Sequence, residues 1–218
     1  MSAAQSALEL DRLAERVARF VPRRAPSLGR PAAVLVPVLP HPGGLHLLFT
    51  ERAATLRAHA GQISFPGGKI DPGDKGIREA ALREANEEVG LDPLHARLVG
   101  ELDDCPTFVT GYVISPVVAI IDAAAMDPDG RYPWRASASE VVRIHELPLE
   151  EFLDPSSLRI EERERDGVRF ELYWYTVRGT IVWGATARIV HQLLDVALGR
   201  PIEAPPWESQ VSTVRSAP

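Results

Sequence analysis

The most informative part of the chain is residues 68–91, which read Gly-Lys-Ile-Asp-Pro-Gly-Asp-Lys-Gly-Ile-Arg-Glu-Ala-Ala-Leu-Arg-Glu-Ala-Asn-Glu-Glu-Val-Gly-Leu. A glycine-rich loop runs into a helical pattern that carries three carboxylates, Glu84, Glu87 and Glu88. Residues three and four apart share one helical face, so Glu84 lies beside both of the others. A divalent cation removes the repulsion between such charges, and carboxylate oxygens suit Mg²⁺ or Mn²⁺. The stretch therefore predicts a helix with one face built to hold metal.

The opposite face of the same helix is apolar. Leu82, Ala85 and Val89 form a stripe that can pack against a core. Asp74 is expected to cap the start of the helix, and Gly90 is expected to end it. A solvated acidic face is the plainer interpretation of such a carboxylate cluster. The glycine loop and the ordered spacing of the charged residues argue against it.

Residues 83–91 resemble the second half of the Nudix box, the signature of hydrolases that cleave nucleoside diphosphates linked to another group. Asp74 stands where the general box has a Glu, and one extra residue separates it from Arg83. This longer spacing follows Phe-Pro-Gly-Gly at residues 65–68, and both features are similar to the coenzyme A pyrophosphatase branch.

Four further blocks carry the same likeness, over about residues 31–198 in all. They are Leu-Leu-Phe-Thr-Glu-Arg at 47–52, Leu-Arg-Ala-His-Ala-Gly-Gln-Ile-Ser-Phe at 56–65, Thr-Phe-Val-Thr-Gly-Tyr at 107–112 and Ile-Val-Trp-Gly-Ala-Thr-Ala at 181–187. The resemblance implies an α/β/α sandwich with a mixed sheet flanked by helices. It also implies a Mg²⁺- or Mn²⁺-dependent pyrophosphatase that splits coenzyme A or acyl-coenzyme A.

The residues expected to bind metal are Glu84, Glu87 and Glu88, and the resemblance adds the backbone carbonyl of Gly68. Arg83 is expected to point away from the metal by the helical period. The resemblance implies that Arg83 ties the loop to the helix through an ion pair, which would orient the carboxylates.

Two residues are candidates for the general base. Glu87 lies on the helix itself, and Glu140 precedes a predicted strand, where many relatives carry a catalytic acid on a loop. A solvated strand-edge position is the alternative for Glu140. A further acidic group at residues 101–104 is expected to be solvated and is a weaker candidate for metal contact.

Substrate recognition is assigned to arginines and to the glycine loop. Arg52 and Arg57 could bind phosphates through charge-assisted pairs, and Gly67 and Gly68 would let the backbone approach the substrate. His59 is expected to order the loop by hydrogen bonding. Elsewhere in the chain, Trp183 is expected to be a core residue rather than a platform for adenine, and Cys105 a small core residue.

Two other functions stay open from the sequence. One is a Nudix pyrophosphatase that acts on a different nucleoside diphosphate derivative, such as ADP-ribose or NADH. The other is a catalytically silent module that only binds nucleotides, although the complete carboxylate set argues against it. The sequence does not decide the oligomeric state.

Composition narrows the class of protein. The chain has 218 residues, 45% of them hydrophobic, which suits a single domain with a sizeable core. The net charge of −6 argues against a protein that grips nucleic acid broadly. The single cysteine excludes an internal disulfide and fits a cytoplasmic protein. The sequence has no apolar run long enough to predict a membrane span, and no pattern that predicts a secretory signal.

Hydrophobic patterning predicts three parts. Residues 1–30 hold an amphipathic helix and a lead-in, 31–199 form the Nudix domain, and 200–218 form a mobile tail rich in Pro and Ser. The predicted elements within the domain are strands at 32–39, 45–50, 97–102, 113–121 and 140–146, a short helix near 149–153, a charged hairpin of 158–165 with 169–177, and a closing helix at 185–198.

Overall fold

The computed structural model describes residues 9–25, 29–53, 61–107, 111–165, 168–205 and 207. Arg57 and His59 lie outside these ranges. Within these ranges the α-helices are α2 (Leu10–Arg19), α3 (Ile77–Val89) and α4 (Gly184–Leu198). The strands are β1 (Arg30–His41), β2 (Gly44–Arg52), β3 (Ile63–Ser64), β4 (Gly67–Lys69), β5 (Ala96–Glu101), β6 (Cys105–Pro106), β7 (Tyr112–Ile121), β8 (Val141–Pro148), β9 (Leu158–Arg165), β10 (Val168–Val177) and β11 (Thr180–Trp183).

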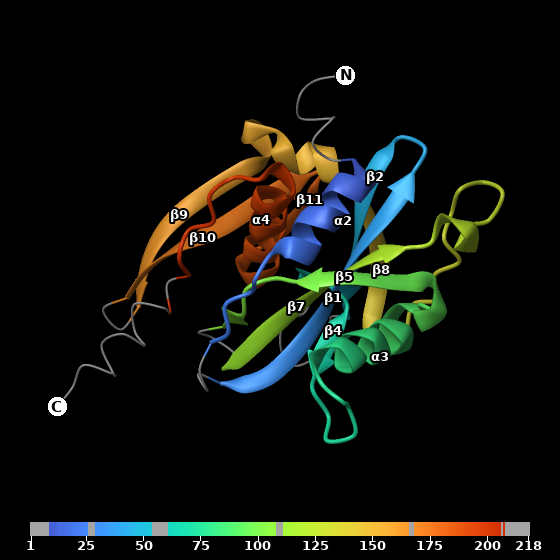
Figure 1. Cartoon of the computed structure of the whole chain (residues 1–218), viewed down its shortest axis with the longest axis horizontal. Helices are drawn as coiled ribbons and strands as arrows, with labels where there is room; N and C mark the ends of the chain where they lie inside the picture. Colours follow the sequence, from blue (N-terminus) through green and yellow to red (C-terminus); the bar gives the residue numbers. More distant parts are fainter. Residues whose placement is uncertain are drawn as a thin grey trace.

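A mixed sheet of eight strands forms the centre of the molecule (Figure 1). Its order is β3-β2-β1-β7-β5, with β4 on β1, β6 on β7 and β8 on β2. β1 runs parallel to β7 and antiparallel to β2, to which it is joined by a tight turn after His41. The predicted β1–β2 hairpin is therefore confirmed, and a run of buried residues along β7 fits a strand covered on both faces.

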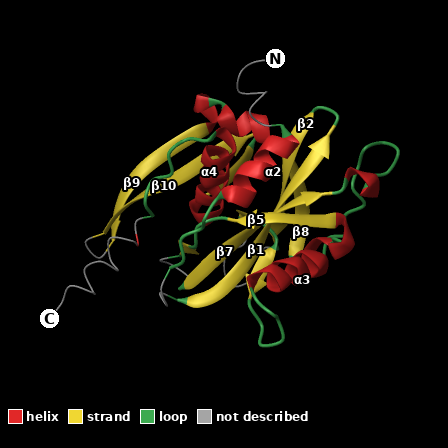
Figure 2. Cartoon of the chain, in the orientation of Figure 1, coloured by secondary structure: helices red, strands yellow, loops and turns green. Residues whose placement is uncertain are grey.

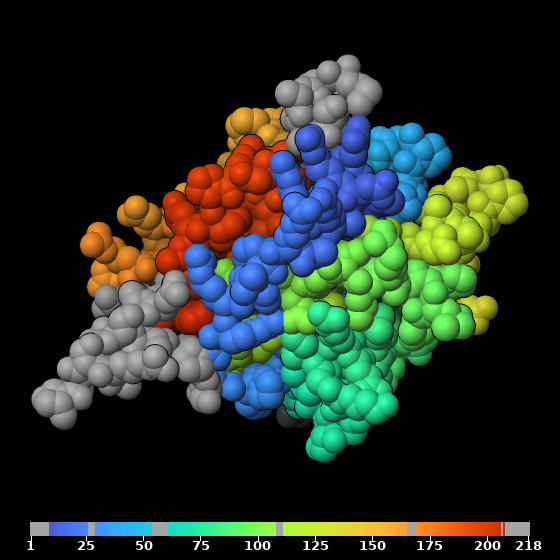
Figure 3. Space-filling model, viewed as in Figure 1, coloured from blue at the N-terminus to red at the C-terminus, as the bar shows by residue number. Residues whose placement is uncertain are grey.

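Helices cover both faces of this sheet (Figure 2). On one face α2 and α4 lie side by side, as the blue and red segments show in Figure 3. Leu13 and Val17 of α2 are fully buried in the same core as Leu193 of α4. On the other face α3 packs through Ala81, Ala85 and Val89. The α/β/α sandwich predicted from the sequence is confirmed.

A second sheet of three strands, β11-β10-β9, packs against α4. The sequence predicts the β9–β10 hairpin but not β11 or a separate sheet. Trp183 of β11 stacks on Trp174 of β10, with ring centroids 5.0 Å apart, and the Arg159 guanidinium lies over the other indole. The Trp183 side chain thus belongs to a row of packed side chains across the second sheet.

Two short strands bring the glycine loop into the central sheet. β3 pairs with the end of β2, and β4 pairs with β1 so that Gly68 faces Ala33. The Leu35 amide donates to the Pro66 carbonyl between them, at 2.9 Å. The segment that enters the predicted box is therefore held on both sides by strands before it reaches α3.

The acidic group at residues 101–104 is paired rather than solvated, which corrects the expectation from the sequence. Asp103 and Asp104 are buried. Asp104 accepts hydrogen bonds from Arg24 at 2.9 Å and from the Ser115 hydroxyl at 2.7 Å. Asp103 accepts one from the Arg23 amide at 2.7 Å, while Glu101 pairs with Arg24 and with Arg78. These carboxylates fasten the segment after α2 to the domain.

The chain after α4 also departs from the expected tail. Ile202 packs against the core beside α2 and α4. Trp207 is buried, and its indole N–H donates to the Asp104 carbonyl at 3.1 Å. The remainder of the predicted tail lies outside the described residues. Among the described helices, none is long and apolar enough to cross a membrane.

Candidate active site

Helix α3 carries the predicted carboxylates. It begins at Ile77 with Gly76 as its N-cap, so the prediction that Asp74 caps the helix is wrong. Asp74 lies in the loop before the helix, and its carboxylate accepts from the Asp71 amide at 2.7 Å and from Arg83. The predicted end of the helix is confirmed, because Gly90 adopts the left-handed conformation with φ 70°.

Arg83 joins the loop to the helix. Its guanidinium donates to both carboxylate oxygens of Asp74, at 3.0 Å, and to the Lys69 carbonyl at 3.1 Å. The hydrogen bonds from Arg83 and from the Asp71 amide lower the pKa of Asp74. The same guanidinium also contacts Glu84 at 2.9 Å and Glu87 at 3.2 Å. The expectation that Arg83 points away from the carboxylate face is therefore wrong: the arginine is a neighbour of that face.

Glu84 packs directly against the glycine loop. A Cβ atom on Gly68 would lie 2.5 Å from one oxygen of the Glu84 carboxylate, so a larger residue there would displace the Glu84 side chain. Burial is the main cause that raises the pKa of Glu84, and Glu87 and Glu140 add to it by charge repulsion. The backbone of β4 and the second turn of α3 thus meet at one carboxylate.

Glu88 is the most buried of the three carboxylates, at 3% exposure. Its Oε2 has no hydrogen-bond partner among the described residues, and the Arg52 guanidinium lies 3.9 Å from its Oε1. Burial raises the pKa of Glu88 to about 7, against the opposing effects of Arg52 and a hydrogen bond from the Gly67 backbone. A buried carboxylate oxygen without a partner is costly unless an ion or a proton compensates it.

The carboxylates on α3 are suited to bind a divalent cation. Glu84 and Glu88 are one turn apart, and Glu88 presents a buried oxygen that no described side chain satisfies. Glu87 is the exposed member of the set. No three acidic, histidine or cysteine side chains of the described ranges converge closely enough to hold an ion as they lie here. Arg83 contacts Oε1 of Glu84 and Oε2 of Glu87.

The segment before β8 lies against the end of α3. The Ser137 amide donates to the Glu88 carbonyl at 2.9 Å, and the Ala53 amide donates to the Glu140 carbonyl at 2.8 Å. Glu140 occupies a turn just before β8, its side chain is exposed, and its charge contributes to the raised pKa values of Glu84 and Glu88. The structure therefore brings Glu140 near the carboxylate face although it is about fifty positions further along the chain.

Of the predicted substrate-binding residues, Arg52, Gly67 and Gly68 come together beside Glu84 and Glu88. Arg57 lies outside the described residues. The segment 135–137 was not a candidate from the sequence. It contributes backbone amides, and backbone hydrogen bonds leave no signature in the residue types.

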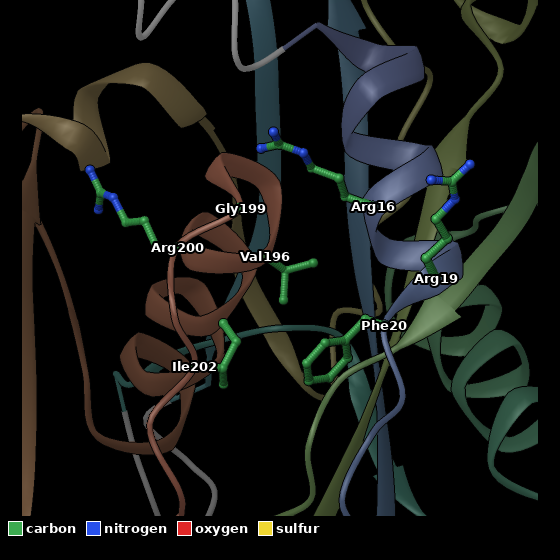
Figure 4. Close-up of a pocket in the computed structure, with 7 residues that line it drawn as sticks. All are labelled: Arg16, Arg19, Phe20, Val196, Gly199, Arg200 and Ile202. Atoms are coloured by element: carbon green, nitrogen blue, oxygen red, sulfur yellow. The ribbon is translucent and has the colours of Figure 1, made fainter.

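A separate open cavity of about 250 Å³ lies between α2 and α4 (Figure 4). Phe20, Val196 and Ile202 line it together with arginines. Arg16 donates to the Ala197 carbonyl, Arg19 pairs with Glu15 and Arg200 lies 3.6 Å from Asp195. These arginines are thus engaged at the ends of the two helices, on the face of the sheet opposite to α3.

Comparisons with known proteins agree with this geometry. The NUDIX domain family model matches residues 29–169. A curated relative from Photorhabdus laumondii, named uncharacterized Nudix hydrolase NudL, is 40% identical over 172 residues, which are 79% of this chain and 87% of the relative. Its counterpart of the same name in Cronobacter sakazakii is 43% identical over 194 residues, 86% of this chain and 94% of the relative.

A solved structure shares the fold. The Nudix hydrolase RenU of M. smegmatis matches with a TM-score of 0.51 at 18% identity, over 85% of this chain and 92% of that one. Nudix hydrolases generally use divalent metal ions and act on small nucleotide substrates. From the matched family model, the relatives and the fold, the chain belongs to the Nudix hydrolase family and is a pyrophosphatase, an enzyme that hydrolyses phosphoanhydrides.

Proposed function

We propose that this enzyme hydrolyses the diphosphate bond of coenzyme A or its acyl derivatives, giving 3′,5′-ADP and 4′-phosphopantetheine or its acyl form. The observation that carries the proposal is the meeting of two sequence blocks at one place. Arg52 ends the first block and lies 3.9 Å from Glu88 in the box. Gly67 and Gly68 of β4, which follow the second block, pack on the same helix. Both blocks resemble the coenzyme A branch.

Glu84, Glu88 and the Gly68 carbonyl would hold Mg²⁺ or Mn²⁺, with Glu87 as a further ligand or a holder of water. When bound, such an ion neutralises charge on the diphosphate oxygens and makes a coordinated water easier to deprotonate. The protein's own contribution is to orient Glu84 by the Arg83–Asp74 pair and to keep Glu88 in a site with little water.

The reaction also needs a group that accepts a proton from water as its oxygen attacks phosphorus. The new P–O bond forms while the bond to the bridging oxygen breaks, and the bridging oxygen leaves with the departing phosphate. Glu140 is our choice for the base, because it is exposed at the edge of the carboxylate face and its backbone is fixed beside Arg52. Glu87 is the alternative, from the helix itself.

Substrate phosphates would pair with arginine. Arg52 is half-buried and lies at the edge of the carboxylate face, where its fork could bind the diphosphate or the 3′-phosphate. Arg57 is proposed for the same role on the sequence likeness alone. The presence of a single cysteine, Cys105, fits the proposal that the enzyme works in the cytoplasm.

The test is a product assay with the purified protein and Mg²⁺ over a panel of coenzyme A, ADP-ribose and NADH. Preferred release of 3′,5′-ADP from coenzyme A supports the proposal. Equal or faster hydrolysis of ADP-ribose or NADH would replace it with the second candidate, a pyrophosphatase for other nucleoside diphosphate derivatives. Nucleotide binding without turnover on any substrate would point to a silent module.

A further inference from the structure

The segment from Tyr132 to Glu140 caps the carboxylate helix from outside. The Arg135 amide donates to the Val89 carbonyl and the Ser137 amide to the Glu88 carbonyl, both at 2.9 Å. Carbonyls in the last turn of a helix have no partner within the helix. The segment therefore supplies hydrogen-bond donors to the free carbonyls at the end of α3, and it lies against the turn that contains Glu88.

The far end of this segment fixes the backbone of Glu140. The Glu140 amide donates to the Ser137 carbonyl at 3.0 Å, and the Glu140 carbonyl accepts from Ala53 at 2.8 Å. Ala53 follows Arg52, so the turn is tied to the end of β2 and, through Ser137, to α3. The position of the Glu140 side chain depends on how firmly the segment is held.

The near end is held by side chains. The Trp134 indole N–H donates to the Glu146 carboxylate at 2.5 Å, and its ring stacks on Tyr132 with centroids 3.8 Å apart. Tyr132 is buried in the core beneath α3. The second oxygen of Glu146 lies 2.8 Å from His41 Nε2. A hydrogen bond to a charged acceptor is roughly twice as strong as a neutral one, so Trp134 is a firm anchor.

Glu146 belongs to β8, the strand into which Glu140 leads. Trp134 therefore connects the start of the segment to the same strand that receives its end, and the backbone bonds to α3 lie in between. The contact between the Trp134 indole and the Glu146 carboxylate therefore closes the segment into a loop.

We propose that Trp134 is a positioning residue: by its bond to Glu146 it holds the segment 135–140 on α3 and so places Glu140 at the carboxylate face. This rests on the proposed role of Glu140 as the base. In this proposal Trp134 acts through the segment and not through contact with the substrate or the reacting atoms. Misplacing a reacting group by about 1 Å can cost up to about 100-fold in rate.

Trp134→Phe tests the proposal, because it removes the indole N–H and keeps a ring to stack on Tyr132. The expected result is a fall in kcat of about 10- to 100-fold with KM little changed. In the Glu140→Gln background the same substitution should cost nothing more. In the metal-free protein, the amides of Arg135 and Ser137 should exchange with deuterium faster than in the wild type. Glu146→Ala, which removes the acceptor, should reproduce these effects.

Trp174→Phe is the matched control. Trp174 is also half-buried and stacked, on Trp183, and its indole N–H has no hydrogen-bond partner in the described structure. It should leave kcat and the exchange of both amides unchanged. The proposal is overturned if the losses of Trp134→Phe and Glu140→Gln multiply, or if amide exchange is unchanged in Trp134→Phe. Kinetics are measured on whichever substrate the wild type hydrolyses, so failure of the coenzyme A assignment leaves this test intact.

Discussion

At Glu88 the enzyme buries a carboxylate to 3% exposure beside Arg52, with one oxygen lacking a partner. Its pKa is raised from 4.5 to about 7, chiefly by burial. The ionised form therefore costs the metal-free protein about 3 kcal/mol, from 1.36 kcal/mol for each pKa unit. Such a cost is typical of a site whose geometry serves chemistry rather than stability.

Glu88→Gln should raise the melting temperature of the metal-free enzyme. The raised pKa means that stability falls as pH rises from about 4.5 to 7 and stays lower above it. Glutamine cannot ionise, so the mutant does not lose stability over this pH range. Its Tm should exceed that of the wild type by several degrees at pH 8 and match it near pH 4. Thermal melts in chelator at both pH values check this.

Activity of Glu88→Gln should fall by orders of magnitude, since the substitution removes a proposed ligand. Glu87→Gln, at the exposed position, should shift Tm much less. A Glu88→Gln protein that melts below the wild type at pH 8 would contradict the account of a strained carboxylate.

At the scale of elements, the sequence predicted what local patterns determine. The α3 stripe, its end at Gly90 and the β1–β2 hairpin follow from residue spacing and turn chemistry. The N-cap prediction was wrong because the Asp74 carboxylate accepts hydrogen bonds from Arg83, nine positions away, and not from an amide at the start of the helix. The backbone bonds from segment 135–137 to α3 could not be predicted, since any residue can donate them.

Gly68→Ala tests how closely β4 and α3 fit. The new Cβ would lie 2.5 Å from the Glu84 carboxylate, so this carboxylate must move. It can move because it is the end of a flexible side chain. We expect metal affinity and kcat to fall by about 10- to 100-fold with little change in Tm. Titration with Mn²⁺ and steady-state kinetics measure both.

Gly73→Ala in the same loop is the control, because a Cβ there meets nothing within 4 Å. It should bind Mn²⁺ as the wild type does. Equal metal affinity in Gly68→Ala and the wild type would show that the close approach of Gly68 to Glu84 is irrelevant to the site.

At the level of the whole molecule, the ends of the described chain are held by hydrogen bonds to residues 103 and 104. Asp103 pairs with Arg23, 80 positions away, and the carbonyl of Asp104 receives Trp207, 103 positions away. Such partners leave no local pattern, which is why the sequence predicted a solvated acidic patch and a free tail. The carboxylates proposed to bind metal could be predicted from the sequence because they lie within about one turn of one helix.

Asp104→Ala should destabilise the enzyme without harming its chemistry. Asp104 accepts from Arg24, Ala25 and Ser115, and leaving a buried donor without its acceptor costs about 1–3 kcal/mol. Urea unfolding should show this loss, while kcat per folded molecule stays at the wild-type value. The control is Glu162→Gln, an exposed change on β9 that should leave the midpoint in place. A large loss of kcat in folded Asp104→Ala would place this carboxylate in the site.

The activity proposed for the site formed by α3 and Arg52 is hydrolysis of the diphosphate of coenzyme A. The most direct measurement is kcat/KM of the wild-type enzyme for coenzyme A, ADP-ribose and NADH at saturating Mg²⁺, with products identified by mass and a parallel reaction in chelator. The account predicts that coenzyme A is the best substrate, that it yields 3′,5′-ADP and 4′-phosphopantetheine, and that chelation abolishes turnover. A higher kcat/KM for ADP-ribose or NADH, or turnover that survives chelation, would contradict it.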